Sequence, residues 1–70
     1  MAQLYMTKGK EIKRRRFEMN VTAVRMAEVL EVPVSFIRGY EKGDVLTYEI
    51  VEEISWFLHC EVSDIAYEYA

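Results

Sequence analysis

The sequence is short of the residue types that build metal sites and covalent cross-links. Among its 70 residues there is one cysteine, Cys60, and one histidine, His59. A single cysteine excludes an internal disulfide. One histidine and one cysteine fall short of the roughly four ligands of a structural zinc site, and a catalytic thiol needs a base beside it in space. We therefore expect no metal and no cofactor.

Glycine is also scarce, and the acidic residues show no catalytic spacing. The three glycines, Gly9, Gly39 and Gly43, are too far apart in sequence to form a phosphate-binding loop. The adjacent carboxylates Glu52 and Glu53 would point in different directions on a helix, because neighbouring residues do not face each other there. From these observations we expect that the protein is not an enzyme.

Long apolar runs are missing as well. No stretch approaches the roughly 20 apolar residues of a membrane span, and residues 1–7 lack the basic and apolar parts of a signal peptide. These features predict a cytoplasmic protein. Hydrophobic residues make up 51% of the chain, which is enough for one packed core, and the length allows one domain.

Positive charge is absent from the C-terminal part of the chain. All nine Lys and Arg residues lie within residues 8–42, which also hold five acids, a net charge of +4. Residues 43–70 carry seven acids and no Lys or Arg. A DNA-binding domain usually presents a basic face, because phosphate neutralisation supplies much of its affinity. The N-terminal part could form such a face, with the acidic part pointing away from the duplex.

Apolar periodicity and capping residues predict an all-α, single compact domain of five helices over residues 8–70. Thr22, Thr47 and Ser63 are the N-cap candidates, Pro33 separates two helices, and Gly43 would end the third in a left-handed conformation. The expected helices are 8–19, 22–30, 34–43, 47–58 and 63–69. Residues 1–7 would be an N-terminal arm, either frayed or packed on the domain through its apolar residues.

Residues 22–43 predict two short helices joined by a tight turn. Their apolar and small positions, followed by an acidic residue and a glycine, are Met26-Ala27, Val32, Ile37 and Glu41-Lys42-Gly43. This pattern resembles the helix-turn-helix of the Cro/repressor-type (XRE-like) family of bacterial and phage regulators, and the resemblance extends over about 10–66. It implies a repressor-like fold.

Arg16 lies at the spacing where that family has an arginine that pairs with the acidic residue, here Glu41. A partly buried arginine needs a bidentate partner, which a carboxylate supplies. We therefore expect Arg16 and Glu41 to form a structural ion pair.

The resemblance also implies which residues would meet DNA: the first residue of the second helix and the early residues of the third. By position these are Ala23, Val34, Ser35, Phe36 and Arg38. Only Ser35 and Arg38 can hydrogen-bond through their side chains. Val34 and Phe36 could touch thymine methyl groups, could form a patch for a protein partner, or, for Phe36, could fold back onto the domain.

Two further groups of residues have a structural and a functional interpretation. Lys10, Lys13 and Arg14 would either contact phosphates or form an ordinary solvated face. Apolar and aromatic residues near the C-terminus exceed what one small core needs, and tyrosine and tryptophan often anchor interfaces. The candidates for a dimer interface are Ile50, Trp56, Phe57, Tyr67 and Tyr69.

Two functions therefore follow from the sequence. The first is a small DNA-binding transcriptional regulator, a repressor or Cro-like protein, that binds double-stranded DNA as a dimer with its third helix in the major groove. The alternative is an antirepressor or modulator with the same fold. It would bind another regulator through Val34, Phe36 and its acidic C-terminal half, because an acidic surface complements a basic DNA-binding face.

Overall fold

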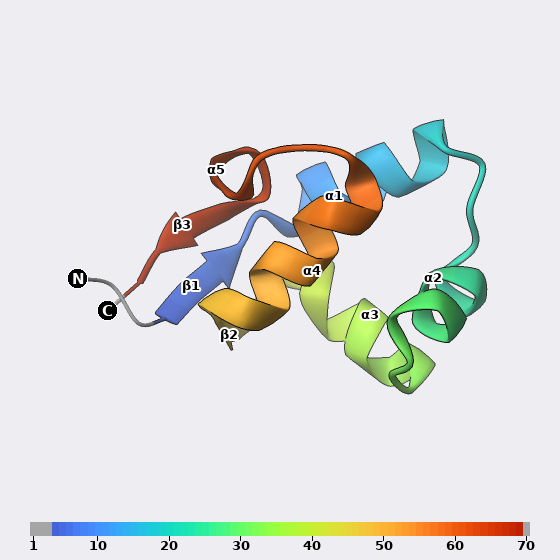
Figure 1. Ribbon diagram of the computed structural model, residues 1–70, viewed down its shortest axis with the longest axis horizontal. Helices are drawn as coiled ribbons and strands as arrows, with labels where there is room; N and C mark the ends of the chain where they lie inside the picture. Colours follow the sequence, from blue (N-terminus) through green and yellow to red (C-terminus); the bar gives the residue numbers. More distant parts are fainter. Residues whose placement is uncertain (1–3, 70) are drawn as a thin grey trace.

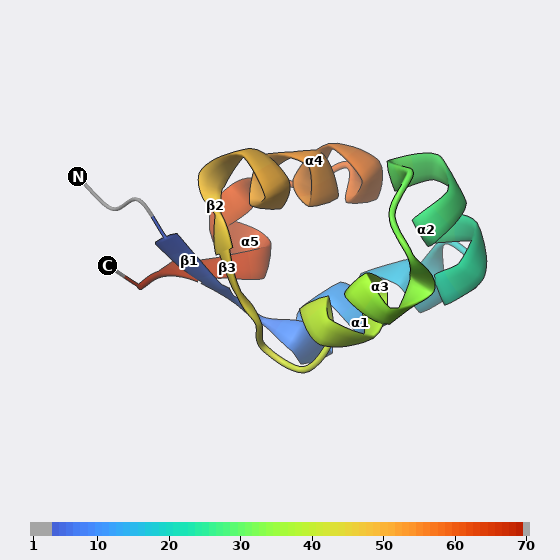
Figure 2. The same cartoon turned by 90° about the horizontal axis from the view of Figure 1, so that it is seen from below.

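The computed structural model describes residues 4–69, which form five helices and three short strands (Figure 1). In chain order these are β1 Leu4–Thr7, α1 Gly9–Glu18, α2 Ala23–Leu30, α3 Val34–Tyr40, β2 Val45–Thr47, α4 Tyr48–Leu58, α5 Val62–Ile65 and β3 Ala66–Glu68. The sheet lies at one end of the molecule and α2 lies at the other, with α3 next to α2, as both Figure 1 and Figure 2 show.

The three strands form an antiparallel sheet with β1 in the centre, in the order β2-β1-β3. Met6 faces Val45 of β2 on one side and Tyr67 of β3 on the other. Backbone hydrogen bonds extend both ladders beyond the strands. The N–H of Thr7 donates to the Asp44 carbonyl at 3.0 Å, and the N–H of Tyr69 donates to the Leu4 carbonyl at 2.9 Å. The sheet thus ties both ends of the described chain to the turn after α3.

The expectation of an all-α domain is therefore wrong, and the fold is mixed α and β. Residues 4–7, assigned to an N-terminal arm, are the central strand, while residues 1–3 lie outside the described part of the chain. The expected fifth helix over 63–69 is also wrong, because α5 is only the four residues Val62–Ile65 and the chain continues as β3. Ala66 is already extended, with φ −154° and ψ 154°.

The core lies between the helices and draws on every one of them. The side chains with no exposed surface come from α1, α2, α3, α4 and α5, and they are Ile12, Met26, Ile37, Val51, Ile54 and Ile65. Burial of such side chains is the main favourable contribution to folding. Because each helix contributes at least one of them, the positions of α2 and α3 are fixed by the rest of the domain.

Local chemistry explains the ends of α2 and α3. Thr22 caps α2, since its hydroxyl accepts a hydrogen bond from the N–H of Arg25 at 3.1 Å. Glu31 ends α2 in the left-handed conformation with φ 58°, and Pro33 precedes α3. The third helix ends at Tyr40 rather than at Gly43. Gly43, with φ 102°, turns the chain into β2, a conformation that glycine adopts without a steric penalty.

Gly9 and Gly39 allow a test of how tightly these elements meet. A Cβ at Gly9 would collide with the backbone carbonyl of Glu41, whereas a Cβ at Gly39 would meet only the Asp44 carboxylate, which can rotate away. We expect Gly9→Ala to destabilise the protein by about 1–3 kcal/mol through overpacking. Gly39→Ala should be neutral or stabilising by up to about 1 kcal/mol, because alanine favours helix. Urea unfolding followed by circular dichroism measures both, and equal effects would contradict the close approach at Gly9.

Candidate nucleic-acid interface

A buried ion pair joins α1 to the end of α3. Nε of Arg16 lies 2.6 Å from one carboxylate oxygen of Glu41, and a terminal nitrogen lies 3.2 Å from the other. The remaining terminal nitrogen donates to the Val21 carbonyl at 2.9 Å. The two side chains are 8% and 12% exposed. This bidentate pair, at the positions expected from the sequence, holds the turn after α3 against α1.

The five residues expected to meet DNA differ in how far they reach solvent. Ala23 and Val34 are half-buried and pack against the core. Ser35 and Arg38 are exposed, and Phe36 is 50% exposed, so its ring does not fold back fully onto the domain. The accessible chemistry at the start of α3 is therefore one hydroxyl and one aromatic ring.

A groove beside α3 brings together cations that are distant in sequence. It has a volume of about 310 Å³ and is lined by Lys13 of α1, Arg38 of α3, and Glu41 and Lys42 of the following turn. Lys13, Arg38 and Lys42 take part in none of the ion pairs formed within residues 4–69. The sequence analysis did not single out Lys42.

Arg14 does not belong to this groove, and its charge is already compensated. It pairs with Glu11 and, at 2.6 Å, with Glu18, and Arg15 also pairs with Glu11 at 2.8 Å. The hydrogen bond from Arg14 lowers the pKa of the Glu11 carboxyl, and the same contact raises the pKa of Arg14 further above its usual range. Two arginines and two glutamates leave this face of α1 without net charge, so it offers little to a phosphate.

Three acidic residues of the C-terminal part lie on a different side of the molecule from α3. Glu49, Glu52 and Glu53 are exposed on α4. Figure 2 shows α4 on the opposite side of the molecule from α3 and α1. The glutamates of α4 are thus separated from α3, whereas the Asp44 carboxylate lies against α3 at Gly39.

Of the five expected interface residues, three remain available. Trp56, Tyr67 and Tyr69 are 69%, 59% and 56% exposed. The expectation that Phe57 lies at an interface is wrong, because its side chain is buried in the core. Ile50 is half-buried and packs against that core. Phe57 falls three residues after Ile54, on the apolar face of α4, so the helical spacing itself was the signal for its burial.

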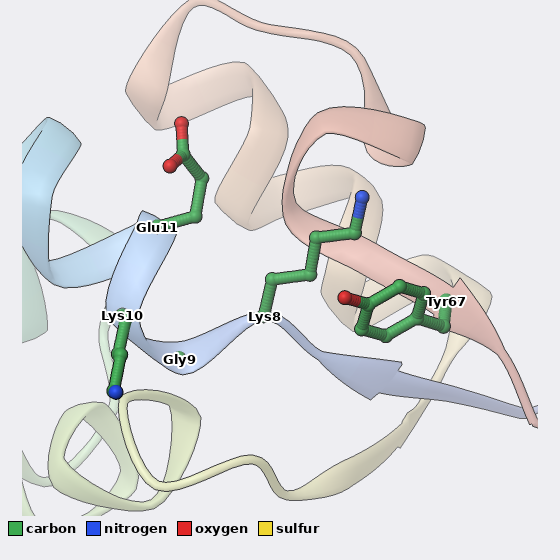
Figure 3. Close-up of a pocket in the computed structure, with 5 residues that line it drawn as sticks. All are labelled: Lys8, Gly9, Lys10, Glu11 and Tyr67. Atoms are coloured by element: carbon green, nitrogen blue, oxygen red, sulfur yellow. The ribbon is translucent and has the colours of Figure 1, made fainter.

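Figure 3 shows a second hollow, at the start of α1, with a volume of about 440 Å³. Nζ of Lys8 lies 4.6 Å from the centre of the Tyr67 ring and donates to the Ser63 carbonyl at 2.9 Å. The Lys10 side chain points away from Lys8 and Glu11 (Figure 3). Lys8 therefore connects the start of α1 to both β3 and α5. These two contacts partly satisfy its charge within the protein.

Residues 4–69 hold no group of three or more His, Cys, Asp or Glu side chains that could bind a metal ion. Burial raises the pKa of the Cys60 thiol above its ordinary value, which disfavours the reactive thiolate. No helix in this part of the chain has both the length and the apolar character to cross a membrane.

Known proteins give no further guide to the site. No protein-family model, no curated protein and no solved structure matches this chain. The likeness to Cro/repressor-type helix-turn-helix proteins therefore rests on the sequence pattern within about 10–66 alone and remains a prediction.

Proposed function

We propose that this chain is a small DNA-binding transcriptional regulator, a repressor or Cro-like protein, that places α3 in the major groove. The observation that carries the proposal is the exposed start of α3, which packs firmly against α2 and lies beside three cations that form no ion pair within residues 4–69. Recognition helices of this kind reach base edges mainly with their N-terminal residues. In α3 the exposed residues there are Ser35 and Phe36, which suit a hydrogen bond and a thymine methyl contact.

The distribution of charge supports the same orientation. Lys13, Arg38 and Lys42 lie beside α3, while the exposed glutamates of α4 lie on the opposite side of the molecule (Figure 2). A duplex that approaches α3 would thus meet cations first. Nonspecific affinity for DNA comes largely from such contacts with phosphates.

A dimer would give the protein two recognition helices. Of the residues expected at its interface, the exposed aromatic ones are Trp56, Tyr67 and Tyr69. Two-fold dimers of helix-turn-helix proteins bind half-sites separated by about one turn of DNA, roughly 34 Å. We expect the operator to be a pseudo-palindrome with that spacing.

Selection from a randomised duplex library tests sequence preference directly. We expect a preferred sequence to emerge, and Ser35→Ala to lose about 1 kcal/mol of discrimination at one base-pair position. Ser63→Ala, an exposed serine on α5, is the matched control and should leave the selected sequence unchanged. Fluorescence anisotropy with labelled duplexes measures both variants. Selection that returns no preferred sequence would contradict the proposed function.

A protein-binding function is the second candidate, and one observation favours it. Phe36 is half-exposed at the start of α3, where Ala23 and Val34 also offer no side-chain hydrogen-bonding group. An antirepressor or modulator could use this apolar surface and the acidic side of α4 against another regulator. Failure of the library selection, together with loss of a regulator complex in Phe36→Glu, would favour this function over DNA binding.

A further inference from the structure

We propose that Lys13, Arg38 and Lys42 form a clamp for one backbone phosphate of DNA, and that Arg38 contacts this phosphate rather than a base. The inference rests on the proposed function and specifies how the site divides between positioning and sequence readout. Its basis is the groove of about 310 Å³ in which the three cations meet. They come from three segments, namely α1, α3 and the turn after α3, so the groove exists only in the folded chain.

Glu41, the one carboxylate among the lining residues of this groove, does not neutralise its three cations. Both oxygens of Glu41 are engaged by Arg16, at 2.6 and 3.2 Å, and the Glu41 side chain is 12% exposed. Arg16 therefore balances the charge of Glu41. Since the three cations join no ion pair within residues 4–69, a phosphate can approach them without displacing a carboxylate.

The remaining arginines of the chain present a contrast. Arg14, Arg15 and Arg25 each have a glutamate partner on their own helix. An anion that approached any of these would compete with that glutamate. The groove thus differs from these arginines because, within residues 4–69, no carboxylate pairs with its three cations.

The position of Arg38 on α3 favours a phosphate over a base edge. Arg38 lies in the last turn of α3, one turn after Ser35 and about 200° around the helix from Phe36, whereas recognition helices reach base edges mainly with their N-terminal residues. Its neighbours in the groove, Lys13 and Lys42, lie outside α3, on elements that would flank the major groove rather than enter it. Contacts with phosphates fix the register of a protein on the duplex and carry no sequence information directly, which is the role that residues at these positions would have.

The test compares charge-removing variants on the duplex selected from the library and on duplexes that differ from it by single base pairs. Lys13→Gln, Arg38→Gln, Lys42→Gln and the triple variant are measured by fluorescence anisotropy over a range of salt concentrations. For the triple variant we expect affinity to fall by a similar factor on every duplex. The slope of log K against log salt should become shallower by about 0.9, the value for one phosphate.

Arg15→Gln is the matched control, because it removes the same charge from α1 at a residue that is paired with Glu11 and faces the α4 side. It should leave affinity and slope nearly unchanged. The three groove side chains are exposed, and thermal unfolding confirms that each variant is folded.

The outcomes separate the clamp from the proposed function. If Arg38→Gln reduces the difference in affinity between the selected duplex and the substituted duplexes, then Arg38 reads a base. That result would overturn the clamp but leave DNA binding in place. If the triple variant keeps the affinity and slope of the unaltered protein, the clamp is also overturned. If the unaltered protein binds no duplex, both the clamp and the proposed function fail.

Discussion

Arg16→Met is expected to lower the free energy of unfolding by about 3–5 kcal/mol, because it leaves the Glu41 carboxylate buried and unpaired. Both side chains are almost inaccessible to solvent, and the guanidinium also satisfies the Val21 carbonyl. For a domain of this size, a loss of about 3 kcal/mol lowers the melting temperature by about 12 °C or more. Urea and thermal unfolding followed by circular dichroism measure the effect.

Arg14→Gln is the control for that experiment. Arg14 makes two ion pairs, with Glu11 and Glu18, yet its side chain is 51% exposed. Exposed pairs of this kind contribute little to stability, so we expect a change within about 1 kcal/mol. Replacing both members of the buried pair, in Arg16→Met/Glu41→Leu, should recover part of the lost stability. Equal effects of Arg16→Met and Arg14→Gln would show that burial does not determine how much the Arg16–Glu41 ion pair contributes to stability.

Met6→Pro is expected to destabilise the protein by about 3 kcal/mol or more, because proline is not tolerated in a central strand. Bonded pairs alternate along an antiparallel ladder. Since the N–H of Thr7 faces β2, the N–H of Met6 faces β3, where Tyr67 is its partner. The substitution removes that donor. Hydrogen exchange of the strand amides, together with urea unfolding, would detect the loss of the sheet.

Met6→Val is the matched control, since valine favours strands and keeps the N–H. It should change the free energy of unfolding by no more than about 1 kcal/mol, the cost of a modest change in packing. If Met6→Pro proved as mild as Met6→Val, residues 4–7 would behave as a frayed arm and the central position of β1 would be contradicted.

The helices were largely accessible to sequence reasoning, whereas the sheet was not. Periodicity and local caps predict helices near α1 to α4, because Thr22 and Pro33 act on their own neighbourhoods. Strands of three or four residues are too short to show a period. Their pairing joins residues about 40 to 60 positions apart, as in Met6 with Val45 and Tyr67. Tyr67 in β3 was a weak signal of a strand, because aromatic residues favour strands.

The candidate site divides in the same way. The spacing of Arg16 and Glu41 anticipated their contact, since it follows from the helix-turn-helix pattern. The compensation of Arg14 was also available, because Glu11 and Glu18 lie three and four residues away along one helix. The groove of Lys13, Arg38 and Lys42 was not available, because it depends on how α1 packs against the turn after α3.

The salt dependence of DNA binding tests the central claim most directly. The protein would be titrated with the selected duplex and with a scrambled duplex of the same composition, over a range of salt concentrations. If the protein is a DNA-binding regulator, log K should fall steeply with log salt concentration on both duplexes, since each neutralised phosphate contributes about 0.9 to the slope. The affinity for the selected duplex should be clearly higher than that for the scrambled one. Binding that is weak, equal on both duplexes or independent of salt would contradict the claim that α3 reads DNA.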